Sequence, residues 1–146
     1  MTPLDLAMRF VGELRERRGG ESHPFIAWCH ELAGMSPSTD DNVPWCSSFV
    51  NAICWMLRLP RSKSARARSW LDIGTSVDLA QAEPGYDIAV FSRGVSPTAG
   101  HVGFFAGTGR DTAGDLVVRI CGGNQGDNVT VASFLASQLL GIRRVR

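Results

Sequence analysis

The sequence predicts an α+β fold, with helices in the N-terminal half and an antiparallel sheet in the C-terminal half. Apolar residues recur at helical spacing as far as about residue 57. After residue 85 the chain consists of short runs rich in β-branched and aromatic residues, separated by Gly, Pro, Asp and Asn. Because the helices precede the strands and do not alternate with them, the order favours α+β over α/β.

Three helices are expected in the first half of the chain. The first covers 3–18, with Thr2 as N-cap and a proline at the first helical position. The second covers 24–33 and ends before a glycine. The third begins at Cys46, and one of its faces carries Cys, Phe, Val, Ile, Cys and Leu at positions 46, 49, 50, 53, 54 and 57. The rest of this helix is also mostly apolar, so we expect it at the centre of the fold.

The strands follow a basic connection, and turn residues separate them. We expect them at "YDIAVF", "HVGFFAG", "LVVRICGG", "NVTV" and "LLGIRRV". The connecting loops include "VSPTAG" and "TGRDTAGD". The sequence has no internal repeat and no low-complexity segment. Residues 1–146 are therefore expected to form a single domain, long enough to bury a core.

Composition argues against several classes of partner. The hydrophobic fraction of 44% and the charged fraction of 20% are typical of a globular protein. A formal net charge of +1 gives no electrostatic reason to expect nucleic acid or an acidic membrane surface as a partner. No apolar run reaches the roughly 18–20 residues that a bilayer requires. We therefore expect neither nucleic acid nor membrane as a partner. We also expect the protein to be a monomer.

The N-terminal segment carries Asp5, Arg9 and Glu13 where a signal peptide would be apolar, so synthesis in the cytoplasm without a signal peptide is expected. The four cysteines are then expected to be reduced thiols. None of them forms a C-x-x-C pair, and no Cys/His cluster has zinc-finger spacing. The residues therefore predict no metal site and no cofactor.

Cys46 is the candidate nucleophile, in the segment "VPWCSSFVNAICW". A helix N-terminus favours the thiolate and offers unpaired N–H groups that can hold an oxyanion. Cys54 lies two turns deeper on the same face and has neither advantage. A first-turn cysteine by itself is more often a packed core residue, so the assignment depends on a base elsewhere. Cys29, Cys54 and Cys121 are expected in the core.

A cysteine nucleophile needs a base, and the chain has three histidines. His23 and His30 are expected at the surface. His101 opens the strand "HVGFFAG", and strand alternation places it on one face with Gly103 and Phe105. Because Gly103 has no side chain, we expect this face to be open to a substrate. The alternative is a strand-end histidine bonded to a turn carbonyl.

A third polar group would hold the imidazole. "ICGGNQGDN" follows the next strand, so Asn124 is expected on the strand beside His101. An amide in that place fixes the ring tautomer through a hydrogen bond. The alternative is a plain turn, which the same Gly and Asn residues build well.

Together, "DDNVPWCSSFVNAICW", "AGHVGFFAG" and "CGGNQGDNV" resemble the CHAP group of cysteine- and histidine-dependent amidohydrolases/peptidases. Within that group the chain is most similar to compact phage and prophage cell-wall hydrolases. "GGESHPFIAWCHELAG", "ARSWLDIG" and "EPGYDIAVF" are similar to further segments of this subgroup. The resemblance covers residues 11–144 and depends on the order and spacing of the motifs, since none is specific alone.

The resemblance implies a papain-like (CHAP/NlpC-type) fold in which Cys46 is the nucleophile, His101 the base and Asn124 the residue that orients the base. It implies an endolysin-like peptidoglycan hydrolase that cuts an amide bond, as an endopeptidase or as an N-acetylmuramoyl-L-alanine amidase. The partner would then be peptidoglycan, reached in the cell wall (the periplasm) after release or delivery. The resemblance implies no cofactor.

One departure from the family's pattern concerns the support of His101. Many CHAP enzymes carry a glutamate two residues before the asparagine, and here that position is Gly122. The support would then rest on Asn124, with Gln125 or Asp127 nearby. A second departure is the extra Tyr86 in the Pro-Gly-Asp-Ile motif.

Asp41, Trp45 and Gln125 are secondary candidates for substrate contact. For Trp45, burial near the central helix is the competing interpretation. Some family members bind calcium in the loop before the cysteine. Asp40 and Asp41 do not make up a full set of calcium ligands, so no metal is expected there either.

Three alternatives remain open from the sequence. The same chemistry could belong to an antibacterial amidase effector, delivered by a secretion machine and accompanied by a cognate inhibitor. A CHAP-like module could bind cell wall or a partner without catalysis, and Gly122 is the only reason to consider it. A thioester-forming acyltransferase could use the same fold.

Overall fold

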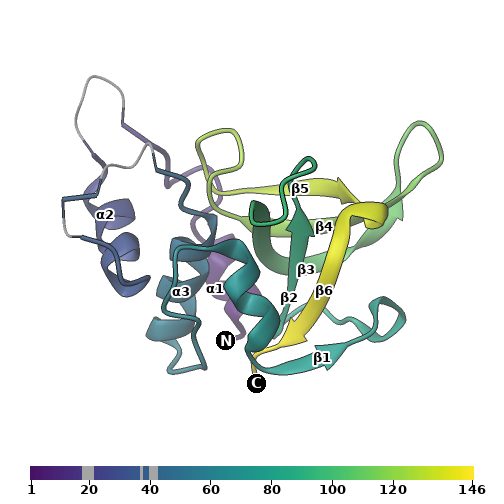
Figure 1. Ribbon diagram of the computed structural model, residues 1–146, viewed down its shortest axis with the longest axis horizontal. Helices are drawn as coiled ribbons and strands as arrows, with labels where there is room; N and C mark the ends of the chain where they lie inside the picture. Colours follow the sequence, from purple (N-terminus) through teal and green to yellow (C-terminus); the bar gives the residue numbers. More distant parts are fainter. Residues whose placement is uncertain (18–21, 37, 40–42) are drawn as a thin grey trace.

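The computed structural model describes residues 1–17, 22–36, 38–39 and 43–146. Its elements confirm the predicted α+β class, with the helices first and the strands after them (Figure 1). In chain order they are α1 (Pro3–Met8), α2 (Pro24–Leu32), α3 (Cys46–Met56), the 3-10 helix η1 (Ala67–Asp72), β1 (Thr75–Val77), the 3-10 helix η2 (Leu79–Gln81), β2 (Asp87–Ser92), β3 (Gly100–Arg110), β4 (Leu116–Gly122), β5 (Thr130–Leu135), the 3-10 helix η3 (Ala136–Gln138) and β6 (Leu139–Arg144).

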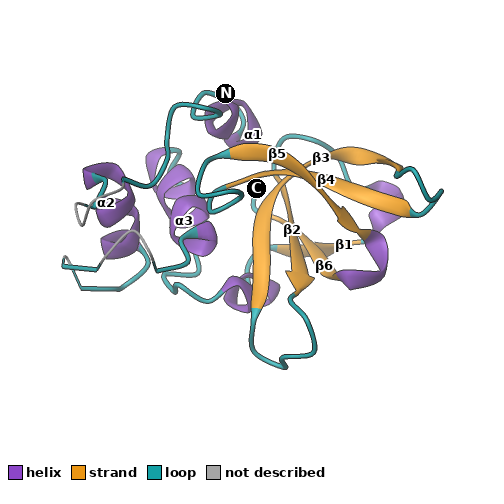
Figure 2. Cartoon of the chain, turned by 90° about the horizontal axis from the view of Figure 1, so that it is seen from above, coloured by secondary structure: helices purple, strands orange, loops and turns teal. Residues whose placement is uncertain are grey.

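The strands form one six-stranded sheet in the order β1-β6-β2-β3-β4-β5, and every pairing is antiparallel, as predicted. Five of the strands overlap the runs expected from the sequence, although β5 shares only Thr130 and Val131 with "NVTV" and β3 continues to Arg110, inside the expected loop "TGRDTAGD". The exception is β1, a three-residue edge strand that pairs with β6. Helices α1, α2 and α3 lie together on one side of the sheet (Figure 2).

Strand alternation gives the sheet two apolar faces. One face joins α3 in the main core, where the sheet contributes Ile88, Val90, Val102 and Phe104 and the helix contributes Phe49, Val50 and Ile53. The other face forms a smaller cluster, covered by residues in and around η2 and η3, and it contains Ala89, Phe91, Phe105, Val118, Ile120 and Ile142. Both sides of the central strands are therefore packed, which fixes the register around His101.

Helix α3 lies at the centre of the fold, as its all-round apolar character predicts. Every residue from Cys46 to Cys54 is buried. Of its three buried polar residues, Ser47 and Asn51 bond to the connection that follows the helix, and Ser48 contacts His30. Ser47 Oγ donates to the carbonyl of Ser64 at 2.6 Å, and Asn51 Nδ2 donates to the same carbonyl at 3.1 Å. These bonds attach the connection to the N-terminal half of the helix, which begins at Cys46.

The first helix is shorter than predicted: α1 ends at Met8, and the expected range 3–18 is wrong. Beyond Met8 the chain pairs with the segment between β4 and β5. Gly12 N–H donates to the carbonyl of Val129 at 3.1 Å, and Val129 N–H donates to the carbonyl of Leu14 at 3.0 Å. Gly12 takes a positive φ of 77°, which ends helical geometry. Pairing with a distant segment thus replaces the helical bonds that local periodicity suggested.

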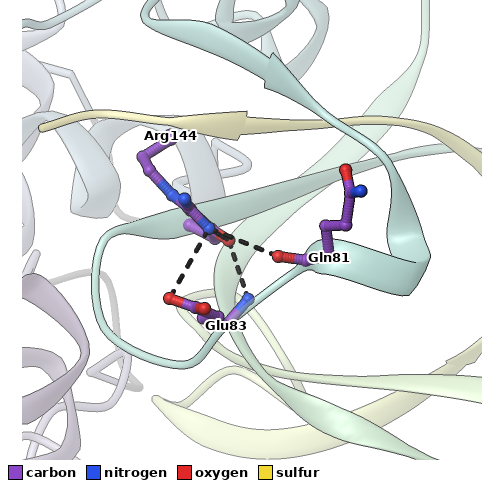
Figure 3. A network of polar contacts seen from close by, with 4 residues as sticks. Gln81, Glu83 and Arg144 are labelled. Atoms are coloured by element: carbon purple, nitrogen blue, oxygen red, sulfur yellow. Dashed lines mark hydrogen bonds and ion pairs between the residues drawn. The ribbon is translucent and has the colours of Figure 1, made fainter.

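An ion pair fixes β6 to β2. Asp87, the fully buried first residue of β2, accepts from Arg144 Nε at 2.6 Å and Nη2 at 2.8 Å. The same guanidinium lies 3.8 Å from a Glu83 carboxylate oxygen and donates to the carbonyl of Gln81 at 3.4 Å (Figure 3). Backbone bonds from Leu4 to Gly85 and from Val145 to Tyr86 attach both ends of the chain to the adjacent turn. This network holds β2, the strand that pairs with the strand of His101.

Among the residues that the structure describes, no helix combines the length and the apolar character that crossing a bilayer would require.

Candidate active site

Cys46 is the first residue of α3, with Trp45 as N-cap. The first bond within the helix runs from Phe49 N–H to the carbonyl of Trp45 at 2.9 Å. The N–H groups of Cys46, Ser47 and Ser48 therefore have no acceptor within the helix. These N–H groups lie at the N-terminus of α3, beside Cys46. Such unpaired donors can hold a negatively charged oxygen.

The thiol of Cys46 is buried, with 4% of the residue exposed. Burial raises the pKa of the Cys46 thiol, while the backbone N–H groups of Val102, Ser47 and Cys46 and the positive charge of Arg93 act in the opposite direction. Since burial is the largest of these effects, the resting thiol is protonated and a base must remove its proton. Because the backbone N–H of Val102 acts on the pKa of the thiol, the thiol lies near the start of β3, where Val102 directly follows His101.

His101 lies on β3 and is 2% exposed. Its Nε2 is 2.8 Å from Oε1 of Gln125, and its ring stacks on Phe134 with the centroids 4.9 Å apart. The stacking partner comes from β5 and the hydrogen-bond partner from the loop after β4. Two separate segments thus determine the position and the tilt of the imidazole.

The contacts of Gln125 fix the tautomer of His101. Gln125 Nε2 donates to the backbone carbonyl of Thr130 at 2.8 Å and to its Oγ1 at 3.0 Å. A carbonyl oxygen only accepts, so this bond defines which end of the amide is nitrogen. Oε1 therefore faces the imidazole and accepts the Nε2 proton. In the neutral ring Nδ1 then carries the lone pair, and this buried atom has no hydrogen-bond partner among the described residues.

The pKa of His101 is consistent with a neutral ring. The pKa of His101 is lowered to about 4, mainly by burial. The hydrogen bond that His101 donates to Gln125 acts to raise this pKa, and the positive charge of Arg93 acts to lower it. At neutral pH the imidazole is therefore unprotonated and able to accept a proton at Nδ1. No hydrogen bond joins the thiol to the imidazole among the described contacts. Such bonds often tighten only when a substrate is bound.

Asn124, the predicted orienting residue, does not lie on a strand. Strand β4 ends at Gly122, and Asn124 takes a left-handed conformation with φ of 60° in the turn that follows. Among the described residues no hydrogen bond joins Asn124 to His101. The next residue, Gln125, reaches the imidazole instead, because the turn reverses the chain and the N–H of Gln125 bonds to the carbonyl of Asn128 at 3.0 Å. The amide that bonds to His101 is therefore that of Gln125, which the sequence offered only as nearby support, and not that of Asn124.

The small residues before Gln125 make room for its side chain. A Cβ at Gly122 would lie 2.7 Å from Oε1 of Gln125, and a Cβ at Gly123 would lie 2.5 Å from the ring of Trp45. Both separations are shorter than real Cβ contacts, and Trp45 is held in the core. Gly122 was the departure that put the support of His101 in doubt. In the structure its missing side chain is what allows Gln125 to approach His101.

The other expected site residues fare differently. Trp45 is fully buried, and its Nε1 donates to Glu16 Oε1 at 2.8 Å. Its ring therefore does not line an open groove, and the competing interpretation, burial near the central helix, is the one that the structure favours. Asp41 lies outside the described residues. Gln125, a candidate for substrate contact, is 8% exposed and bonded to His101.

Two expectations around the histidines are wrong. Gly103 does not leave an open face, because a Cβ there would lie 2.8 Å from Cδ1 of Ile120, whose side chain occupies the space. His30 is fully buried instead of lying at the surface, and its Nδ1 is 2.7 Å from Oγ of Ser48 on α3. Both errors have the same cause, since neighbouring strands and helices fill positions that look free in the sequence.

A polar pocket of about 550 Å³ lies next to this arrangement. It is formed where the chain after α1 meets the turn that follows Gln125. One wall is Glu16, which accepts the hydrogen bond from Trp45. Its lining residues are Arg15, Glu16, Gly126, Asp127 and Asn128. Two further pockets, of about 430 and 510 Å³, lie at the opposite end of α3 from Cys46 and beside η2.

No model of a known protein family matches the sequence. No curated protein matches it either. Within the described part of the chain, no group of three or more His, Cys, Asp or Glu side chains is arranged to hold a metal ion.

The contacts of Gln125 lead to a prediction about its role. We expect Gln125→Leu to keep the buried volume but to lower kcat/KM about 10- to 100-fold, as the loss of a hydrogen bond to a group that becomes charged implies. Because the Gln125 bond raises the pKa of His101, the acidic limb of the pH profile should also move to lower pH. Rate measurements across pH on the folded variant test both effects.

Asn124→Gly is the matched control, since it removes the neighbouring amide and keeps the left-handed backbone accessible. Its activity and pH profile should stay close to those of the wild type. If Asn124→Gly loses more activity than Gln125→Leu, the orienting role belongs to Asn124.

Proposed function

We propose that the protein is a papain-like, cysteine-dependent amidohydrolase of the CHAP type that cleaves an amide bond in peptidoglycan. The observation that carries the proposal is the pair of bonds made by Gln125, from its Nε2 to Thr130 and from His101 Nε2 to its Oε1. They leave Nδ1 of His101 as the basic atom, next to the residue whose N–H contacts the Cys46 thiol. A general base needs a lone pair on the ring nitrogen that takes the proton, and this tautomer leaves one on Nδ1.

In the proposed reaction His101 Nδ1 takes the thiol proton as Cys46 attacks the amide carbonyl. The N–H groups at the start of α3 stabilise the negatively charged oxygen of the tetrahedral intermediate. His101 then returns the proton to the leaving amine, and water releases the acyl group from Cys46. Gln125 keeps the imidazole in the tautomer that both proton transfers require.

Peptidoglycan as substrate rests on the sequence resemblance. Two features of the structure agree with that resemblance: Cys46 is the first residue of α3, and His101 lies on β3, whose Val102 and Phe104 pack against that helix. The protein would act on the cell wall after release or delivery from the cytoplasm. An endolysin-like role and an antibacterial effector share this chemistry and this substrate.

A binding module without catalysis is less well supported. The reason to consider it was the absence of the family's glutamate at Gly122. Gln125 supplies an acceptor for His101 in its place, which removes that reason for preferring the binding module.

Digestion of purified Gram-negative sacculi tests the proposal. The wild-type protein should release soluble fragments whose masses correspond to cleavage of one type of amide, and the masses distinguish an amidase from an endopeptidase. A heat-denatured sample provides the blank. If the folded protein sediments with the sacculi and releases no fragment, the binding module replaces the hydrolase.

A further inference from the structure

We propose that Arg93 forms a carboxylate-binding subsite beside Cys46, so that the preferred substrate is an amide whose acyl part carries a free carboxylate close to the scissile carbonyl. This inference rests on the proposed function and specifies its substrate. It is argued from the position of Arg93, from the loop that holds it and from its lack of a partner.

The sheet register places Arg93 next to the catalytic histidine. Phe91 on β2 pairs directly with His101 on β3, and Ser92 pairs with Gly100. Arg93 is the next residue, the first of the loop 93–99 that joins these strands. Opposite residues in an antiparallel pair lie about 5 Å apart, so two residues beyond Phe91 remain within reach of the imidazole. In Figure 1 this loop and the loop between β4 and β5 lie at the same end of the sheet.

The loop that begins at Arg93 is firmly attached. Arg68 of η1 donates from Nε to the carbonyl of Ala99 at 2.9 Å and from Nη2 to the carbonyl of Ser96 at 2.9 Å. Oγ of Ser96 also accepts from the N–H of Ala99 at 3.0 Å. These bonds attach the second half of the loop to η1, and Arg93 directly follows Ser92, which pairs with Gly100 at the end of β2.

The guanidinium of Arg93 is exposed and has no ion pair or hydrogen bond among the described residues. Six of the other arginines in the described part of the chain are engaged. Those that donate to backbone carbonyls or to a carboxylate include Arg61, Arg68, Arg110, Arg119, Arg143 and Arg144. The charge of Arg93 nevertheless acts on both members of the catalytic pair, since it lowers the pKa of Cys46 and of His101.

A free guanidinium in this position suits a carboxylate. Its planar fork matches the two oxygens of a carboxylate, and a cation at the mouth of a site attracts anions. Because the positive charge of Arg93 acts on the Cys46 thiol, a carboxylate bound to Arg93 would lie near the carbonyl that the thiol attacks. The stem peptides of peptidoglycan contain free carboxylates, so the subsite would select among their amide bonds.

Alkylation of Cys46 tests the subsite without requiring turnover. Iodoacetate and iodoacetamide have nearly the same size and both react with the thiolate, but only iodoacetate carries a carboxylate. The ratio of their rates therefore cancels any change in the pKa of the thiol. We expect Arg93→Gln to lower the iodoacetate-to-iodoacetamide ratio at Cys46 by roughly three- to tenfold at low salt, and 0.5 M NaCl to reduce this effect.

Two variants serve as controls. Arg93→Lys keeps the charge and should retain most of the ratio, and Arg119→Gln removes an exposed arginine that bonds to the carbonyl of Thr108 and should leave the ratio unchanged. An equal ratio in the wild type and in Arg93→Gln, with Cys46 reactive, overturns the subsite and leaves the nucleophile in place. If neither reagent modifies Cys46 in the folded protein, both proposals fail.

Discussion

Cys46→Ala should abolish amide cleavage, with a loss of at least about 10³-fold in kcat, because no other group in the site can form the acyl intermediate. The change removes only a sulfur atom from a residue that is 4% exposed. Stability should therefore fall by no more than about 1 kcal/mol. Activity on sacculi and the thermal unfolding midpoint, measured on the same preparation, separate the two effects.

Cys54→Ala is the matched control. Cys54 lies on the same helix and is fully buried, and burial raises the pKa of its thiol to about 12. Its removal should cost stability and leave the activity of the folded molecules intact. A folded but inactive Cys54→Ala protein, or an active Cys46→Ala protein, would overturn the choice of nucleophile.

His101→Ala should lower kcat by about 10²- to 10⁴-fold, the usual contribution of a general base. His23→Asn is a suitable control, because His23 caps α2 through its Nδ1 and asparagine is a good capping residue. The control should keep wild-type activity. Equal activity in His101→Ala and in the wild type would remove His101 from the site.

The pH dependence gives His101 a second signature. Its folded pKa of about 4 lies below the ordinary value of 6.5, so the unfolded chain binds the proton more readily than the folded chain. His101 should therefore reduce the free energy of unfolding as the pH falls from 6.5 toward about 4, with no effect above this window. His101→Ala should lose this part of the pH dependence. Denaturant unfolding of both proteins at several pH values measures the difference.

Much of the fold follows from local sequence patterns. The apolar periodicity that begins at Cys46 predicted α3 and its central place, and alternation and turn residues predicted five of the six strands. Helix α3 satisfies its own hydrogen bonds and β2 to β5 pair with neighbours in the sequence, while β6, which pairs with β1 and β2, was indicated by its apolar run alone. The edge strand β1 is too short to leave such a pattern.

The sequence by itself determined that a cysteine begins the central helix and that a histidine opens a strand. Only the tertiary structure decided which residue holds that histidine, because the choice between Asn124 and Gln125 depends on a left-handed turn and on the space left by Gly122. The same holds for the early end of α1, where pairing with the segment around Val129 replaces helical bonds. Both outcomes also depend on contacts between segments far apart in the chain, Gln125 with His101 and Gly12 and Leu14 with Val129, and local sequence patterns do not show such contacts.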